Sequence, residues 1–265
     1  MSTLTPALLA GLLDDAAVFP PGNAPLGRAV ADHAAHLRSP YAGAVGPLLV
    51  RPDDLARTGE TDVAVVTGLD EVHTAVAAAG PRLRWLEVAL PASATPGEVR
   101  SLASLGTDVF VEVPRDDRAE AVLAELGVAG LWAKFRTGGV RADLHPSEAE
   151  LAVGITTAVA FGVPFKATAG LHHAVRRTDP ETGFEEHGFL NLLVATGRAV
   201  DGATTADVEA ALAARDEAAV AAAALALDPA VREAFHSFGT CSISDPLTEL
   251  ARLDLLPDAW REGAA

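Results

Sequence analysis

Hydrophobic residues fall into short continuous runs that recur along the chain. Eight runs have the length of a strand, and they predict strands over residues 16–19, 46–51, 63–67, 85–90, 109–113, 131–136, 163–168 and 235–241. Runs without a polar position every second residue are typical of strands that are buried on both faces, as in a parallel sheet.

Segments with helical patterns separate these runs. They cover residues 25–38, 53–58, 69–79, 96–105, 116–126, 147–161 and 188–200. Strands that alternate with helices indicate βαβ units, and eight such strands in 265 residues predict an α/β fold, a closed (β/α)8 TIM barrel that forms a single domain over residues 1–265. An open doubly wound sheet is the alternative, although no GxGxxG motif follows the first strand.

Two segments interrupt this alternation. Residues 171–187 are predicted to form a long charged loop after strand seven, and loops of this length often carry binding or lid functions. Residues 203–234 are rich in alanine and predict a helical insertion before strand eight.

The charge of the chain limits the classes of partner that it is expected to bind. The net charge is −16 and the pI is about 4.8, which disfavours nucleic acid and anionic membrane surfaces as partners. The single cysteine, Cys241, excludes an intrachain disulfide, and the N-terminal apolar run has no preceding Lys or Arg of the kind found in signal peptides. We therefore expect a cytoplasmic protein.

The lysines are the most informative residues. Of 20 basic residues only two are lysines, Lys134 and Lys166, and each lies near the end of a predicted strand, four positions before a glycine. Active sites of such barrels lie at the C-terminal ends of the strands. A neighbouring cation and burial lower the pKa of an amine, which can then attack a carbonyl to form a Schiff base. The alternative is that both lysines form core ion pairs with carboxylates such as Glu87 and Glu112.

The segments around these lysines, AKFRTGG and FKATAGLHH, resemble the deoxyribose-phosphate aldolase family of class I aldolases, which are (β/α)8 barrels. Its strand-six motif is of the type K-T-S-T-G and its strand-seven motif of the type K-A-S-G-G. The resemblance implies that Lys134 is the Schiff-base lysine and that Lys166 is the second lysine, which perturbs it. Thr137, Gly138, Ala167 and Gly170 match these motifs, whereas Thr168 replaces a serine and Ala169 a glycine.

The resemblance also implies an acid that relays protons. Glu87 on strand four is the nearest candidate, although the family has aspartate there, and Asp15 on strand one is the second candidate. Where the family binds a substrate phosphate, this chain has Leu171, His172 and His173. We expect the substrate to be bound by Arg136, Thr137, Gly138, Gly139, Thr168, Gly170, His172, His173, Gly239 and Ser242.

These observations predict a lyase of the aldolase type, acting on a small and sugar-like carbonyl compound in carbohydrate metabolism, without any cofactor. One alternative is a metal-dependent barrel hydrolase or isomerase with ligands from His172, His173, His187, Glu185, Glu186, Asp15 and Glu112, although no H-x-H or H-E-x-x-H spacing is present. The other is a barrel that binds a small molecule without catalysis. The sequence leaves open whether the protein is a homo-oligomer.

Overall fold

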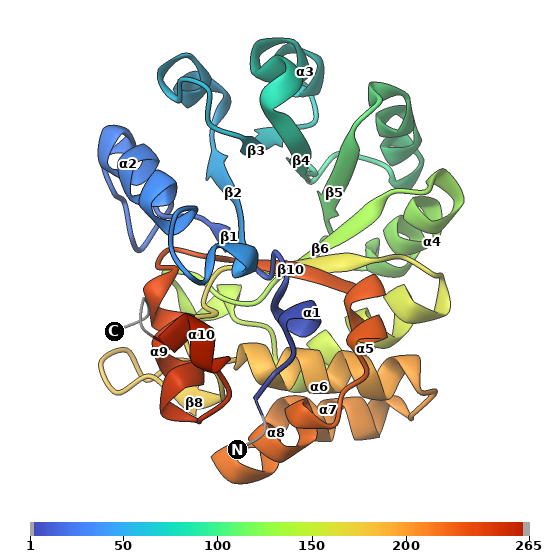
Figure 1. Cartoon of the computed structure of the whole chain (residues 1–265). Coiled ribbons are helices and arrows are strands. Elements are labelled where there is room, and N and C mark those ends of the chain that lie inside the picture. Colours follow the sequence, from blue (N-terminus) through green and yellow to red (C-terminus); the bar gives the residue numbers. More distant parts are fainter. Residues whose placement is uncertain (1–2, 262–265) are drawn as a thin grey trace.

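Eight parallel strands form a closed barrel in the computed structural model, which describes residues 3–261 (Figure 1). The strands are β1 (Leu13–Asp15), β2 (Val45–Val50), β3 (Val63–Gly68), β4 (Leu83–Ala89), β5 (Asp108–Glu112), β6 (Trp132–Arg136), β7 (Phe165–Thr168) and β10 (Phe235–Thr240). They neighbour one another in chain order, and β10 pairs with β1 to close the barrel. The predicted α/β barrel is thus confirmed, and the open sheet is excluded.

The first strand was predicted in the wrong place. The prediction put it at residues 16–19, whereas β1 is Leu13–Asp15 and residues 16–19 already enter a turn closed by Phe19 N–H and the Ala16 carbonyl. The apolar pattern failed here because two of the three strand residues are aspartates, and both are buried. The other seven predicted strands are confirmed, with small differences at their ends.

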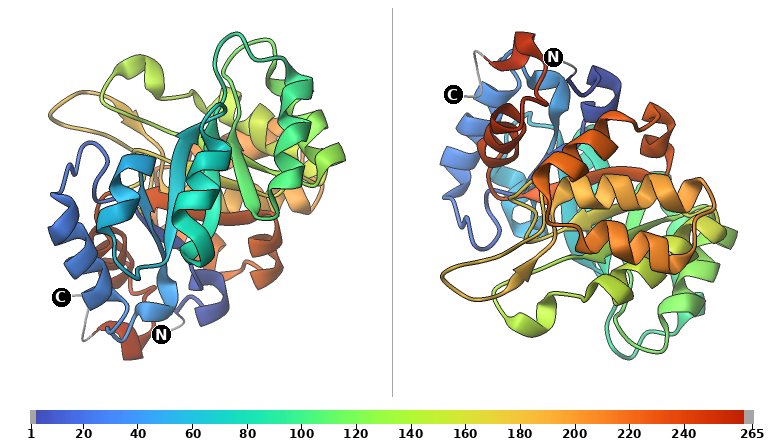
Figure 2. Two further views of the ribbon diagram at one scale, coloured as in Figure 1. Left: turned by 90° about the horizontal axis from the view of Figure 1, so that it is seen from above. Right: turned by 90° about the horizontal axis from the view of Figure 1, so that it is seen from below.

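Helices and 3-10 turns surround the barrel on its outer side (Figure 2). The helices include α2 (Leu26–His36), α3 (Val72–Ala79), α4 (Ala119–Ala129), α5 (Glu148–Ala160) and α6 (Phe189–Val200). The predicted helices at 53–58 and 96–105 are 3-10 segments instead, η2 (Pro52–Arg57) and η4 (Pro96–Leu105). Shorter elements in the same part of the chain are α1 (Pro6–Leu9), η1 (Ala42–Ala44), η3 (Gly80–Arg82) and η5 (Ala142–Leu144).

The chain between β7 and β10 is the longest connection in the barrel. It contains a two-stranded antiparallel hairpin, β8 (Arg177–Thr178) with β9 (Glu185–Glu186), which projects from the barrel (Figure 2). Helix α6 follows, and then α7 (Thr205–Ala213), α8 (Glu217–Leu225) and η6 (Pro229–Glu233). After β10 come α9 (Ser244–Arg252) and α10 (Asp258–Arg261).

Aromatic rings fill the N-terminal end of the barrel. Phe110 packs edge-on against Trp132 with ring centroids 4.8 Å apart and against Trp85 at 5.6 Å. His236 lies 4.9–5.4 Å from all three rings. This layer closes the lower half of the barrel, so the polar residues of the interior lie above it, toward the C-terminal ends of the strands.

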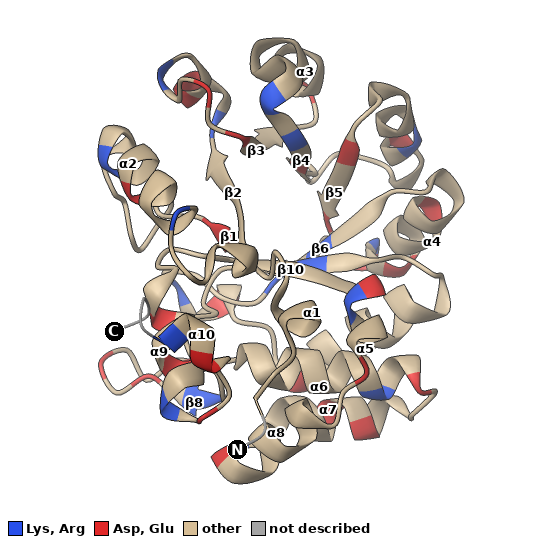
Figure 3. Cartoon of the chain, viewed as in Figure 1, with Lys and Arg blue, Asp and Glu red and all other residues tan. Residues whose placement is uncertain are grey.

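Most charged residues lie on the helices and loops around the barrel, and only a few lie on its strands (Figure 3). Those few strand residues include both lysines. Within residues 3–261, no helix has both the length and the apolar character needed to cross a membrane.

Candidate active site

Lys134 and Lys166 lie opposite each other on neighbouring strands. They are register partners in the parallel pairing of β6 with β7. Residues alternate between the two faces of a strand, and the flanking Phe135 and Phe165 pack against each other on the outer face, so both lysines point into the barrel. Both are almost fully buried, with exposed fractions of 2% and 0%. The two lysines therefore lie side by side on adjacent strands in a buried environment.

Carboxylates hold Lys166 on two sides. Its Nζ donates to Asp14 Oδ2 at 2.5 Å and to Glu87 Oε1. Burial alone would lower the pKa of this amine, but Asp14 and Glu87 outweigh burial and raise it. Lys166 is therefore a cation in the resting protein, as the second lysine must be if its charge is to act on Lys134.

Lys134 contacts the other oxygen of the same glutamate. Its Nζ lies 3.3 Å from Glu87 Oε2 and 3.0 Å from Glu112 Oε2. Glu112 also accepts a hydrogen bond of 2.9 Å from Nε of Arg136. The sequence alternative, in which Glu87 and Glu112 form ion pairs with the lysines, therefore describes the resting geometry.

Six residues form this lysine cluster: Asp14, Glu87, Glu112, Lys134, Arg136 and Lys166. Burial would raise the pKa of Glu87, but the two ammonium groups lower it to about 2. Asp14 differs, because burial outweighs Lys166 and raises its pKa to about 6. With three cations and three carboxylates the charges of the cluster balance when every group is ionised, which makes its burial tolerable.

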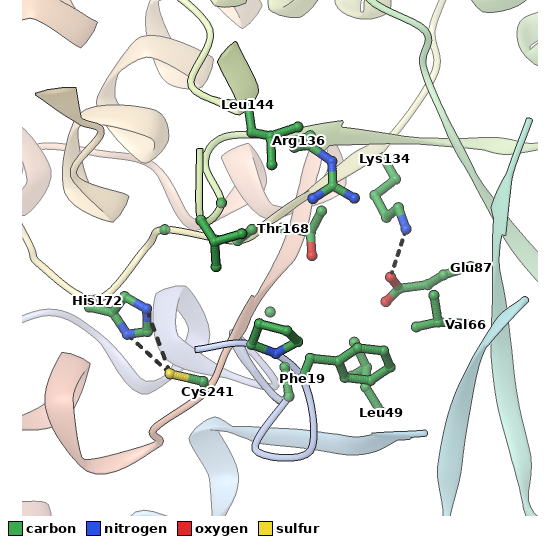
Figure 4. A pocket seen from close by; sticks show the side chains of 17 residues that line it. Phe19, Leu49, Val66, Glu87, Lys134, Arg136, Leu144, Thr168, His172 and Cys241 are labelled. Carbon is green, nitrogen blue, oxygen red and sulfur yellow. Dashed lines mark hydrogen bonds and ion pairs between the residues drawn. The ribbon is translucent and has the colours of Figure 1, made fainter. Parts of the chain in front are cut away.

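A cavity of about 250 Å³ opens above the cluster at the C-terminal ends of the strands (Figure 4). Lys134, Glu87 and Arg136 line one side of it, and Lys134 Nζ points toward Glu87 in the close-up view. Lys166 lies beneath and does not reach the wall. Apolar side chains supply much of the remaining wall, namely Phe19, Pro20, Leu49, Val66, Val140 and Leu144.

Of the residues expected to bind substrate, six line this cavity: Arg136, Gly139, Thr168, Gly170, His172 and Gly239. Two others join the ends of β6 and β7 instead. The Thr137 hydroxyl donates to the carbonyls of Thr168 at 3.1 Å and Ala169 at 2.6 Å. A Cβ on Gly138 would lie 3.0 Å from the Cα of Gly170, so the two loops touch at this glycine.

Three further candidates point elsewhere. His173 lies 3.5 Å from Glu249 and 3.9 Å from Glu186, beside α9 and the hairpin. Ser242 Oγ lies 3.1 Å from Ser244 Oγ at the start of α9. Asp15, the second candidate for proton relay, pairs with His33 of α2 at 3.0 Å. These positions do not bring the three side chains to the lysines.

The sequence interpretation overlooked Asp14 as the partner of Lys166. It named Asp15 as the second candidate for proton relay, whereas Asp14 is the residue that contacts Lys166, because neighbouring residues of a strand face opposite sides. Cys241 also lines the cavity, with its Sγ 3.7 Å from His172 Nε2. Burial raises the pKa of this thiol and lowers that of His172, so both are neutral near pH 7.

The histidines of the metal alternative do not converge. Among residues 3–261, no group of three or more His, Cys, Asp and Glu side chains is arranged to hold a metal ion. His187 Nε2 lies 2.9 Å from the Pro146 carbonyl, and its Nδ1 is 3.3 Å from Arg176. Burial lowers its pKa to about 4.

Comparison with known proteins leaves the family open: no family model matches the chain, and no curated protein matches it.

Proposed function

We propose that the protein is a Schiff-base enzyme, a carbon–carbon lyase of the class I aldolase type, in which Lys134 forms an iminium with a small carbonyl compound. The observation that carries the proposal is the position of Lys134. Its amine lines the cavity at the C-terminal end of β6 and contacts two carboxylates. Nucleophilic catalysis needs an amine that the substrate can reach, with groups nearby that take up its proton.

Lys166 is the less suitable nucleophile. It is fully buried, and Asp14 and Glu87 hold its ammonium group. Its role is to place a positive charge beside the Glu87 carboxylate. This charge holds the Glu87 carboxylate beside Lys166, and the other carboxylate oxygen contacts Lys134.

The carboxylates suit each stage of imine formation. The Lys134 ammonium first gives a proton to Glu87 or Glu112, and the free amine attacks the carbonyl carbon to give a carbinolamine. The same acid then protonates the carbinolamine hydroxyl, which leaves as water. The resulting iminium is a cation where the ammonium had been, so the charge balance of the cluster is restored.

The iminium withdraws electrons from the neighbouring carbon–carbon bond, which favours cleavage or formation of that bond. The size of the cavity restricts the substrate to a small compound, and its mixed wall suits a short chain that carries hydroxyl groups. The Thr168 side chain and the Arg136 guanidinium are the groups able to orient such hydroxyls. This mechanism requires no cofactor.

Exchange of deuterium into small carbonyl compounds tests the proposal without knowledge of the natural substrate. An iminium loses its α-proton to form an enamine, so the protein in D₂O would label acetaldehyde, glycolaldehyde or acetone at the α-carbon, as detected by NMR. We expect exchange with the native chain and none with Lys134→Arg. A chain that combines Lys134→Arg with Arg28→Lys provides a matched control, because Arg28 is 76% exposed at its side chain and the replacement restores an ordinary surface lysine. Equal exchange by the control and the native chain would refute the proposal.

A further inference from the structure

A second cavity lies at the opposite end of the barrel. Its volume is about 310 Å³, and it is lined by residues where strands begin, including Gly46 of β2, Trp85 of β4 and His236 of β10. We call it the floor cavity. The aromatic layer separates it from the cavity above the lysine cluster, at the C-terminal ends of the strands, which we call the substrate cavity.

Asp14 lies next to this floor cavity. Its Oδ2 accepts hydrogen bonds of 2.5 Å from both Lys166 Nζ and Ser237 Oγ. Its Oδ1 is buried and has no hydrogen-bond partner within residues 3–261. A Cβ on Gly46 would lie 2.2 Å from this Oδ1, so the carboxyl group presses against the backbone of a residue that lines the floor cavity.

A continuous chain of polar contacts joins this carboxyl group to the proposed nucleophile. Lys134 Nζ lies 3.3 Å from Glu87 Oε2, and Glu87 Oε1 accepts a hydrogen bond from Lys166 Nζ. Lys166 in turn donates to Asp14. The chain begins in the substrate cavity and ends one residue from the floor cavity.

We propose that Asp14 stores the proton that Lys134 releases, and that this proton exchanges with solvent through the floor cavity instead of the substrate cavity. The inference rests on the proposed function of Lys134 only for the origin of the proton. This route keeps the path of the proton apart from the path of the substrate. A bound substrate would block the substrate cavity at the moment when the amine must lose a proton.

The proton count balances at every step. Lys134 passes a proton to Glu87 Oε2, and a half-turn of the Glu87 carboxyl group about its Cγ–Cδ bond carries this proton to Lys166. Lys166 gives one of its own protons to Asp14 Oδ2 and takes the one from Glu87. The outcome is a neutral Lys134 amine and a neutral Asp14 acid, while Glu87 and Lys166 regain their charges.

The charges around Asp14 suit a carboxyl group that gains and loses a proton. Burial raises its pKa to about 6, whereas Lys166 and the Ser237 hydroxyl lower it and Glu87 raises it further. Arg232 of η6 attracts it from a greater distance. His236 is neutral near pH 7, because burial lowers its pKa to about 4.

Infrared difference spectra measure the proposed acid directly and need no substrate. We expect the carbonyl band of a protonated carboxylic acid to grow as the pH falls from about 8 to 5, and Asp14→Asn to remove it. A transfer from H₂O into D₂O then shifts the band at the rate at which the acid exchanges with solvent. Absence of the band from the native chain, or its survival in Asp14→Asn, would overturn the inference.

Two substitutions at cavity rims separate the two routes. Ala10 is exposed and lines the floor cavity, whereas Val140 is 66% exposed and lines the substrate cavity. We expect Ala10→Trp to slow the isotope shift of the Asp14 band by about tenfold or more, and Val140→Trp to leave it unchanged. Slowing by Val140→Trp, or no slowing by Ala10→Trp, contradicts the route through the floor cavity.

Reductive trapping of glycolaldehyde by cyanoborohydride connects Asp14 to Lys134. Loss of the negative charge in Asp14→Asn would by electrostatics alone make Lys134 less basic and faster to trap. Storage of the proton predicts the opposite, a rate at pH 7 that falls by about tenfold, and a rate that rises refutes it. If no aldehyde is trapped by the native chain, the proposed function fails, but the infrared measurements still decide whether Asp14 is the floor-accessible acid.

Discussion

Glu87 contacts Lys166 through Oε1 and Lys134 through Oε2, so one carboxylate bridges the only two lysines of the chain. The three side chains come from β4, β6 and β7, and they lie above the aromatic layer and below the substrate cavity. This bridge gives the two lysines different roles, because only Lys134 also lines the cavity.

Removal of the bridging charge will destabilise the protein. Glu87→Gln keeps the shape of the side chain but leaves two buried ammonium groups with one carboxylate fewer, and loss of one partner from a buried ion pair costs about 3–5 kcal/mol. We expect a loss of this size in the free energy of unfolding, measured with urea. Glu112→Gln is the matched control, because its side chain is 21% exposed and Lys134 keeps Glu87. An equal loss in the two variants would contradict the central place of Glu87.

A buried histidine will make the fold sensitive to acid. The pKa of His187 falls from 6.5 in the unfolded chain to about 4 in the folded protein, because the ring is buried. The unfolded chain therefore binds a proton first, and the stabilisation that is complete above pH 6.5 is lost as the pH falls toward 4.

This loss amounts to roughly 3 kcal/mol for one residue. Unfolding free energies measured across this range test it, and His187→Gln will reduce the slope with pH. His73 is exposed, so His73→Gln is expected to leave the slope unchanged. Identical slopes in the native chain and in His187→Gln would show that His187 does not contribute.

Thr137 will matter for stability through its hydroxyl group. Thr137→Val keeps the volume but removes both hydrogen bonds to the end of β7, and we expect a loss of about 1–3 kcal/mol in the free energy of unfolding. Thr137→Ser retains the hydroxyl and is expected to lose less than half as much. If the serine variant is as unstable as the valine variant, the hydroxyl group is not the source of the stability.

Sequence reasoning located most of the barrel because its strands are buried on both faces and stand out as continuous apolar runs. It misplaced the first strand, where Asp14 and Asp15 interrupt the run. Buried aspartates are tolerated there because each has a cationic or histidine partner from a distant part of the chain, Lys166 for Asp14 and His33 for Asp15. No local pattern reveals such partners.

In the candidate site, too, the sequence reveals some residues and not others. Lysine is rare in this chain, so Lys134 and Lys166 were identifiable, and Glu87 followed from its position on a strand. Leu49 and Val66 line the cavity but resemble any other strand residue in the sequence. Gly138 was expected to bind substrate, whereas the structure places it where two loops touch, a position that depends on the pairing of β6 with β7.

Mass mapping of a reduced Schiff base shows whether Lys134 is the nucleophile. The native chain is treated with glycolaldehyde and borohydride at neutral pH and digested, and the modified peptide is identified beside that of Lys166→Arg. We expect one adduct on the native chain, located on Lys134, and the same location in Lys166→Arg if that variant folds. An adduct on Lys166, or no adduct on Lys134 with any small aldehyde or ketone, would contradict it.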